Sequence, residues 1–204
     1  QLYIISAPSG AGKTSLVKAL IATQKDVKVS ISHTTRAMRE GETDGENYYF
    51  VTRENFLALV DQSGFFEHAE VFGNFYGTSK RAVSDMLAQG QDVILEIDWQ
   101  GAQQVRVAQP DAISIFIIPP SLQSLQERLQ RRGQDAPEVI QQRLAKAAIE
   151  ISHYKEYDYL VVNENFDHAF ADLSAIFHSE QLKLLRQQAN EVPRLAELLS
   201  TVAD

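Results

Sequence analysis

The stretch Leu2-Tyr-Ile-Ile-Ser6-Ala-Pro-Ser-Gly10-Ala-Gly12-Lys13-Thr14 joins a short apolar run to a glycine-rich turn that ends in a lysine and a hydroxyl residue. The apolar segment Leu16-Val-Lys-Ala-Leu20 follows and has the spacing of a helix. A strand, a glycine-rich turn and a helix in this order direct backbone N–H groups and the positive end of the helix toward an anion. We therefore predict that this stretch is a phosphate-binding strand, turn and helix.

The turn resembles the P-loop, in which a lysine reaches the β- and γ-phosphates of a nucleotide and the next hydroxyl is a ligand of Mg²⁺. Lys13 and Thr14 occupy these positions. Ala7 stands where the pattern has its first glycine, which is tolerable if the φ angle of Ala7 is negative. We expect this stretch to bind the phosphates of a nucleotide together with Mg²⁺, with Thr14 as the metal ligand. The expected nucleotide-binding residues are Ala7, Pro8, Ser9, Gly10, Ala11, Gly12, Lys13 and Thr14.

The composition is that of a soluble globular protein, since hydrophobic residues make up 44% and charged residues 23% of the 204 positions. The formal net charge of -8 argues against general nucleic-acid binding, which needs a wide basic surface. The chain has no cysteine, so thiolate metal sites and cysteine nucleophiles are excluded. The longest apolar run, residues 113–118, is too short to span a bilayer, and no signal-peptide pattern is present. We expect a cytoplasmic protein with neither a nucleic-acid nor a membrane partner.

Short apolar runs alternate with segments of helical period, a pattern typical of α/β proteins with a parallel sheet. We predict a P-loop NTPase-type three-layer fold with a five-stranded parallel core sheet, an inserted lobe of mixed small strands and a helical lid. The predicted core strands are residues 2–6, 27–31, 93–98, 113–118 and 159–163. Helices are predicted over residues 54–61, 79–90, 121–133 and 137–152, then as one long helix from about residue 167 and a short one after Pro193.

The inserted region contains short aromatic strands at residues 47–51 and 65–71 and a polar loop with two arginines, Arg36 and Arg39. Guanidinium groups bind phosphate monoesters through paired hydrogen bonds. Glu67 and Asp98 lie in or at the end of apolar strands, where an unpaired carboxylate is costly. The residues alone leave the role of these acids open. They are either functional acids or structural acids with satisfied hydrogen bonds, and Asp98 has the further alternative of binding Mg²⁺ beside the P-loop.

A second group of arginines lies on the helices expected after residue 121. Arg128, Arg131 and Arg132 share much of one helical face, and Arg143 follows on the next helix. Like charges at this spacing repel each other unless an anion lies between them. Two interpretations stay open from the spacing: a solvated face relieved by neighbouring acids, or a lid that closes over polyphosphate.

A series of motifs resembles guanylate kinase in order and spacing, over nearly the whole chain. The motifs are Ala7-Pro-Ser-Gly-Ala-Gly-Lys-Thr14, Ser32-His-Thr-Thr-Arg36, Arg39-Glu-Gly-Glu42, Gly45-Glu-Asn-Tyr48, Phe66-Glu-His-Ala-Glu70, Gly73-Asn-Phe-Tyr-Gly77, Ile97-Asp-Trp-Gln-Gly101 and Val161-Val-Asn163. The resemblance implies a Mg-dependent enzyme of purine metabolism that reversibly transfers the γ-phosphoryl group of ATP to GMP, giving ADP and GDP. It divides the single domain of residues 1–204 into a core (1–31, 81–124 and 153–204), a GMP-binding lobe (32–80) and a lid (125–152).

The same resemblance assigns residues to roles. The GMP phosphate is expected to contact Arg36, Arg39, Tyr48 and Tyr76. The base is expected to contact Ser32, Glu67, Thr78 and Asp98. Glu42 belongs to the same pocket, and Asn163 to the ATP site. The phosphate of GMP is itself the nucleophile, so no general base is assigned, and the expected catalytic residues act by charge: Lys13, Arg128, Arg132 and Arg143. Arg131 matches no family position.

Guanine is distinguishable from adenine by the pattern of its hydrogen-bonding groups. Its N1–H and N2 amino group are adjacent donors that a carboxylate such as Glu67 can accept, and its O6 can accept from a hydroxyl such as that of Thr78. Adenine has an acceptor at N1, which would face the carboxylate. A buried group left without its partner costs about 1–3 kcal/mol.

The chain departs from the family pattern at two positions. Met38 replaces the usual proline between the two arginines, which should leave that loop more flexible before GMP binds. Glu96 replaces the first aspartate of the usual D-x-D pair, so we leave it out of the predicted site. Two alternatives remain: a nucleoside monophosphate kinase of other base specificity, and a non-catalytic guanylate-kinase-like module that binds phosphopeptides. The sequence does not decide whether the chain forms a homo-oligomer or accepts dGMP.

Overall fold

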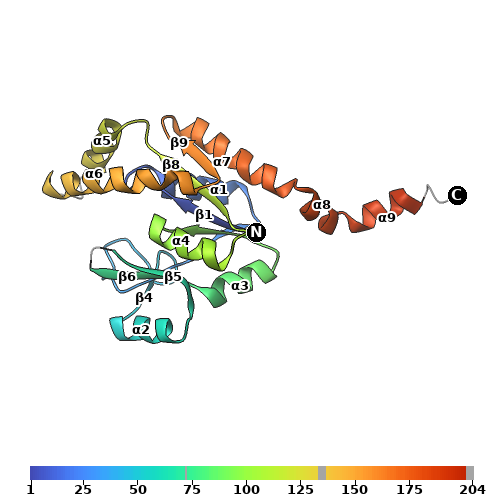
Figure 1. The fold of residues 1–204 in the computed structure, drawn as a ribbon, viewed down its shortest axis with the longest axis horizontal. Coiled ribbons are helices and arrows are strands. Elements are labelled where there is room, and N and C mark those ends of the chain that lie inside the picture. The colour runs from blue at the N-terminus through green and yellow to red at the C-terminus, as the bar shows by residue number, and fades with distance from the viewer. Residues whose placement is uncertain (72, 133–136, 201–204) are drawn as a thin grey trace.

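The computed structural model describes residues 1–71, 73–132 and 137–200, except for the side chain of Arg132 (Figure 1). Its central feature is a five-stranded sheet with the order β2-β7-β1-β8-β9, in which all neighbouring strands are parallel. The strands are β1 (Leu2–Ser6), β2 (Val27–Val29), β7 (Asp92–Glu96), β8 (Ile113–Ile118) and β9 (Tyr159–Val162). The predicted five-stranded parallel sheet is confirmed.

Helices cover both faces of this sheet. On one face, α1 (Lys13–Thr23) and α7 (Phe166–Gln181) pack on Tyr3 and Ile5 of β1. On the other face, α3 (Lys80–Ala88) and α4 (Trp99–Ala108) pack on Leu2 and Ile4. Successive side chains of a strand point to opposite faces, so a strand covered on both sides reads as a continuous apolar run. The three inner strands, β1, β7 and β8, were predictable for this reason.

A smaller mixed sheet with the order β4-β3-β6-β5 lies beside the main body (Figure 1). Its strands are β3 (His33–Thr34), β4 (Tyr49–Phe50), β5 (Phe65–Val71) and β6 (Asn74–Ser79). Helix α2 (Arg53–Asp61) packs on it through Phe56, whose ring stacks on Phe65 and Phe75 at centroid distances of 4.7 and 5.4 Å. All of these elements lie within residues 32–80.

Two helices and one 3₁₀ turn form a unit near the P-loop: α5 (Leu122–Arg132), α6 (Pro137–Ser152) and η1 (His153–Glu156). Leu125 and Leu129 of α5 pack with Ile140 and Ala147 of α6 in a small core of their own. The Ser121 hydroxyl accepts a hydrogen bond from the Ser124 N–H at 3.0 Å and so begins α5 as expected. Gly133, expected to end this helix, lies outside the described residues.

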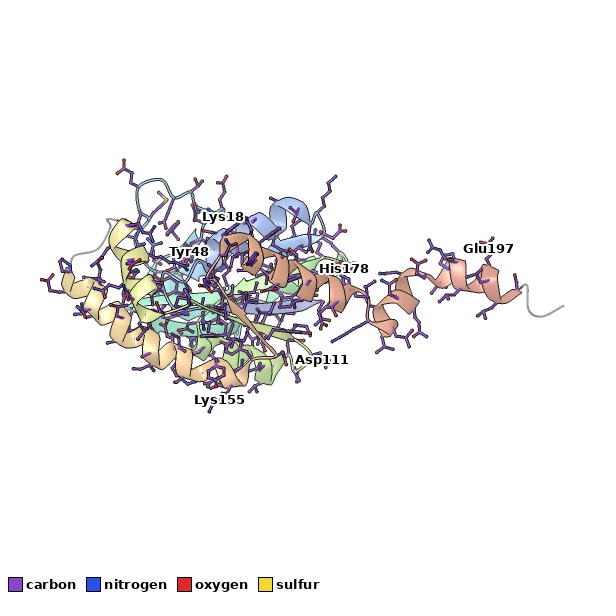
Figure 2. The ribbon with its side chains drawn as sticks, turned by 90° about the horizontal axis from the view of Figure 1, so that it is seen from above. Lys18, Tyr48, Asp111, Lys155, His178 and Glu197 are labelled. Carbon is purple, nitrogen blue, oxygen red and sulfur yellow. The ribbon has the colours of Figure 1, made fainter. Side chains whose placement is uncertain are left out.

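The prediction of one long C-terminal helix was wrong. Helix α7 ends at Gln181, and α8 (Leu184–Asn190) and α9 (Val192–Ser200) follow and project away from the body (Figures 1 and 2). Lys183 has non-helical backbone angles at the break (φ -56°, ψ 136°), and tertiary contacts redirect the chain there. Arg186 Nη2 binds the buried Asp92 carboxylate at 2.9 Å, and Gln187 Nε2 donates to the Gln181 carbonyl at 2.9 Å. No described helix is both long enough and apolar enough to cross a membrane.

Helix α4 was not predicted, because the strand before it was expected to continue to residue 98. Strand β7 ends at Glu96, and the Asp98 carboxylate then accepts a hydrogen bond from the Gly101 N–H at 2.9 Å. This contact caps the first turn of α4.

Candidate functional site

The P-loop runs from the end of β1 into α1. Gly10 and Gly12 have φ angles of 92° and 97°, which favour glycine, whereas Ala7 is not among the described residues with a positive φ. The alanine is therefore compatible with the loop. A β-carbon at Gly12 would also collide with the side-chain amide of Asn163, so close packing adds a second reason for glycine there.

Asn163 and Arg128 hold the P-loop from outside. Asn163 Nδ2 donates to the Ala11 carbonyl at 2.7 Å, and Arg128 donates to the same carbonyl at 3.3 Å and to the Asn163 carbonyl at 2.7 Å. Arg143 Nη1 donates to the Ser9 hydroxyl at 3.1 Å. Two of the arginines assigned to the lid thus contact the P-loop or its immediate support. Arg131 and Arg128 line a second pocket, which lies next to Gly12 and Asn163.

Lys13 and Thr14 meet a carboxylate that we did not place in the site. The Thr14 hydroxyl donates to Glu96 Oε2 at 2.9 Å, and Lys13 Nζ lies 3.9 Å from the same oxygen. Burial lowers the pKa of Lys13, while Glu96 and Asp98 act in the opposite direction. The signal for Glu96 was its place at the carboxyl end of a strand beside β1, where ligands of parallel sheets bind.

A pocket next to Lys13 brings together residues from both sheets. Ser32, Tyr48, Glu67, Tyr76 and Asp98, which the sequence assigned to the GMP site, line it with P-loop residues. The other lining residues are Ala7, Lys13, Ala69, Val71, Glu96 and Ile97. The pocket therefore joins the candidate acceptor residues to the lysine of the P-loop.

Glu67 is the most deeply buried acid of this pocket, with 4% of its surface exposed. Burial raises the pKa of Glu67 to about 7; the hydrogen bond from Thr78 acts against this rise, and the charge of Asp98 adds to it. The Thr78 hydroxyl donates to Glu67 Oε1 at 2.6 Å, and Thr78 is fully buried. In this arrangement Thr78 contacts the carboxylate and does not line the pocket.

Arg36 forms a paired interaction with Glu42. Its two terminal nitrogens donate to the two carboxylate oxygens at 3.0 and 2.7 Å, and the Arg39 N–H donates to Glu42 Oε2 at 2.8 Å. The hydrogen bonds from Arg36 hold the pKa of Glu42 below its usual value. Glu42, whose partner the sequence did not indicate, thus orders the loop that carries both arginines. The Arg36 guanidinium lies 5.4 Å from the centre of the Tyr48 ring, and Tyr48 contacts Tyr76 edge to face.

The comparisons with known proteins agree with this geometry. The family model described as guanylate kinase matches residues 1–180. The chain belongs to the guanylate kinase family. The guanylate kinase of Hahella chejuensis is 63% identical over 98% of this chain and 97% of its own length. That of Escherichia coli K12 is 54% identical over 98% of this chain and 97% of its own length. The crystal structure of guanylate kinase from Anaplasma phagocytophilum superimposes with a TM-score of 0.73 at 40% identity, covering 91% of this chain and 88% of that one. The predicted enzyme class is confirmed.

Glu150 is another residue near the guanylate kinase P-loop that the sequence analysis did not single out. It lies on α6, two helical turns after Arg143, and burial raises its pKa. The Ser9 backbone N–H acts against this rise by hydrogen bonding to the charged form. The side chains of Arg143 and Glu150 therefore both reach Ser9, and helix α6 contacts the P-loop at this residue.

Proposed function

We propose that the chain reversibly transfers the γ-phosphoryl group of Mg-ATP to GMP, giving ADP and GDP. The observation that carries this proposal is the pocket in which Lys13 of the P-loop and the acids Glu67 and Asp98 face the same space. Transfer between two bound nucleotides requires a donor site and an acceptor site that meet, because catalysis of this reaction depends mainly on positioning and charge.

On the donor side, the P-loop from Ala7 to Thr14 would hold the phosphates of ATP, and Asn163 would support the loop. Lys13 would neutralise charge on the transferred group, together with Arg128, Arg132 and Arg143 of the lid. The proposed lid would close further over the phosphates on binding. The contacts of Arg128 and Arg143 with the P-loop support this role, because they direct the lid toward the loop that holds the phosphates.

Mg²⁺ fits the oxygen donors beside the P-loop. Thr14 Oγ1 and the Glu96 carboxylate are the protein oxygens that would hold it, directly or through water. Within the described residues, no group of three or more acidic, histidine or cysteine side chains forms a metal cage. Mg²⁺ usually binds through one or two protein oxygens together with substrate phosphates and water, so it needs no cage of protein ligands. When bound, the ion would supply positive charge at the phosphates.

On the acceptor side, the phosphate of GMP would replace Glu42 at the Arg36 guanidinium or share it, with Arg39, Tyr48 and Tyr76 nearby. The base would lie against Glu67, Asp98 and Ser32. Thr78 would act mainly through Glu67, to which it donates its only hydroxyl proton. Guanine supplies two donors to this acidic end of the pocket, and adenine does not.

The substrates in this proposal are free nucleotides, so we infer a cytoplasmic enzyme without a nucleic-acid or membrane partner. The test follows ADP and GDP together after the protein is mixed with Mg-ATP and GMP. Formation of both products in equal amounts supports the proposal. Release of ADP without GDP would indicate hydrolysis, and no reaction with GMP binding intact would favour the non-catalytic phosphopeptide module.

A further inference from the structure

Helix α4 is joined to β5 through the side-chain amide of Gln104. This amide accepts a hydrogen bond from the His68 N–H at 3.1 Å and donates to the His68 carbonyl at 2.9 Å. Strand β5 is at the edge of its sheet, so one side of its backbone lacks a neighbouring strand. Gln104 satisfies these backbone groups and fixes β5 against α4 at the residue that follows Glu67.

Gly101, one turn before Gln104, lies directly against the Glu67 side chain. A β-carbon at position 101 would be 2.7 Å from Glu67 Oε2, 3.2 Å from its carboxyl carbon and 3.3 Å from its Cγ. These distances are shorter than the about 3.5–4.0 Å at which carbon atoms pack well. A β-carbon here would push the carboxylate out of its buried position and away from the hydroxyl of Thr78, which holds its other oxygen at 2.6 Å.

The backbone gives no reason for a glycine at position 101. The residue lies in the first turn of α4 and is not among the glycines with a positive φ. Alanine is favoured over glycine in a helix. What the glycine supplies here is space.

We propose that Gly101 is a positioning residue for base recognition, because its missing β-carbon admits the Glu67 carboxylate while its N–H holds the Asp98 carboxylate. One residue of α4 thus sets the places of Glu67 and Asp98, two of the three acids that line the pocket. The inference rests on the proposed function, in which these acids bind the base of GMP.

The test compares Gly101→Ala with Glu67→Ala, the double variant and a control, Val107→Ala, which changes an exposed residue of the same helix. We expect Gly101→Ala to raise the KM for GMP by about 10- to 100-fold, the size expected for a displaced buried hydrogen-bonding group. The KM for ATP should stay within about twofold of the wild-type value. The melting temperature should not fall in proportion to the rise in the KM for GMP. In the Glu67→Ala background the same substitution should have no further effect on the KM for GMP, since the side chain it displaces is absent.

Three outcomes would overturn the inference: an unchanged KM for GMP, an equal rise in both KM values, or the same rise in the Glu67→Ala background. If Glu67→Ala alone leaves the KM for GMP unchanged, the assignment of Glu67 to the base fails instead, which is a failure of the proposed function. If Gly101→Ala does not fold, the double variant decides, because removal of Glu67 should restore folding when the collision is with that side chain. A double variant that also stays unfolded would contradict the inference.

Discussion

Lowering the pH below 7 should weaken GMP binding through protonation of Glu67, whose pKa burial raises to about 7. The N1–H and N2 amino groups of guanine only donate hydrogen bonds, so the base needs the ionised carboxylate. When a ligand binds only the ionised form, its dissociation constant rises by the factor 1 + 10^(pKa − pH). Relative to the value for the fully ionised carboxylate, the dissociation constant is expected to rise about twofold at pH 7, about 10-fold at pH 6 and about 100-fold at pH 5.

Calorimetric titration of GMP into the nucleotide-free protein between pH 5 and pH 9 measures this effect. The GMP phosphate also titrates, with a pKa of about 6, so the matched control is Glu67→Gln. Glutamine has the same shape and no titration, and the phosphate behaves alike in both proteins. The ratio of the two dissociation constants isolates Glu67. Titrations in buffers of different ionisation enthalpy should also show that the wild-type protein releases a proton when GMP binds near pH 7.

A ratio that stays constant from pH 5 to pH 8 would show that GMP binding does not depend on the ionised carboxylate of Glu67. Stability gives an independent check with the opposite sign. Because the folded-state pKa of Glu67 is above its ordinary value of 4.5, the folded protein holds a proton that the unfolded chain loses between pH 4.5 and 7. The free energy of unfolding should therefore fall as pH rises through this window, by about 3 kcal/mol in wild type relative to Glu67→Gln.

Three further predictions concern the P-loop, the arginine loop and the proposed lid. Lys13→Ala should abolish phosphoryl transfer while calorimetry still detects GMP binding; equal loss of both would contradict separate donor and acceptor sites. Met38→Pro should tighten GMP binding by a few tenths to about 1 kcal/mol, because proline stiffens an exposed loop; weaker binding would show that position 38 needs a φ that proline cannot adopt. Small-angle scattering should show a smaller radius of gyration with both nucleotides than with neither, and an unchanged radius would speak against closure of the lobes.

The core was predictable because its three inner strands, β1, β7 and β8, are buried on both faces and because helices of clear period follow along the chain. Helix α4 was missed because Asp98, which caps the helix, follows an apolar run in the sequence and was therefore assigned to the end of the strand. The break after α7 could not be predicted, since it depends on the ion pair of Arg186 with Asp92, residues distant in the sequence.

The site likewise has a part that the sequence predicts and a part that depends on contacts between distant segments. The P-loop lies in one continuous stretch, and its order of residues sufficed to locate it. The contacts of Glu96 with Thr14 and of Glu67 with Gly101 join separate elements, and only the folded chain brings them together. Glu42 had no visible partner in the sequence because its role depends on how the loop returns to Arg36.

The acidic end of the pocket should make the enzyme select guanine over other bases. A coupled assay of ADP release, run with GMP, AMP, UMP and dTMP in turn at equal concentrations, measures this selection. We predict that kcat/KM for GMP exceeds that for AMP by about 10⁴-fold, as expected for a site whose buried polar groups the wrong base leaves unpaired. Turnover of AMP as fast as that of GMP would show that the acidic end of the pocket does not select guanine.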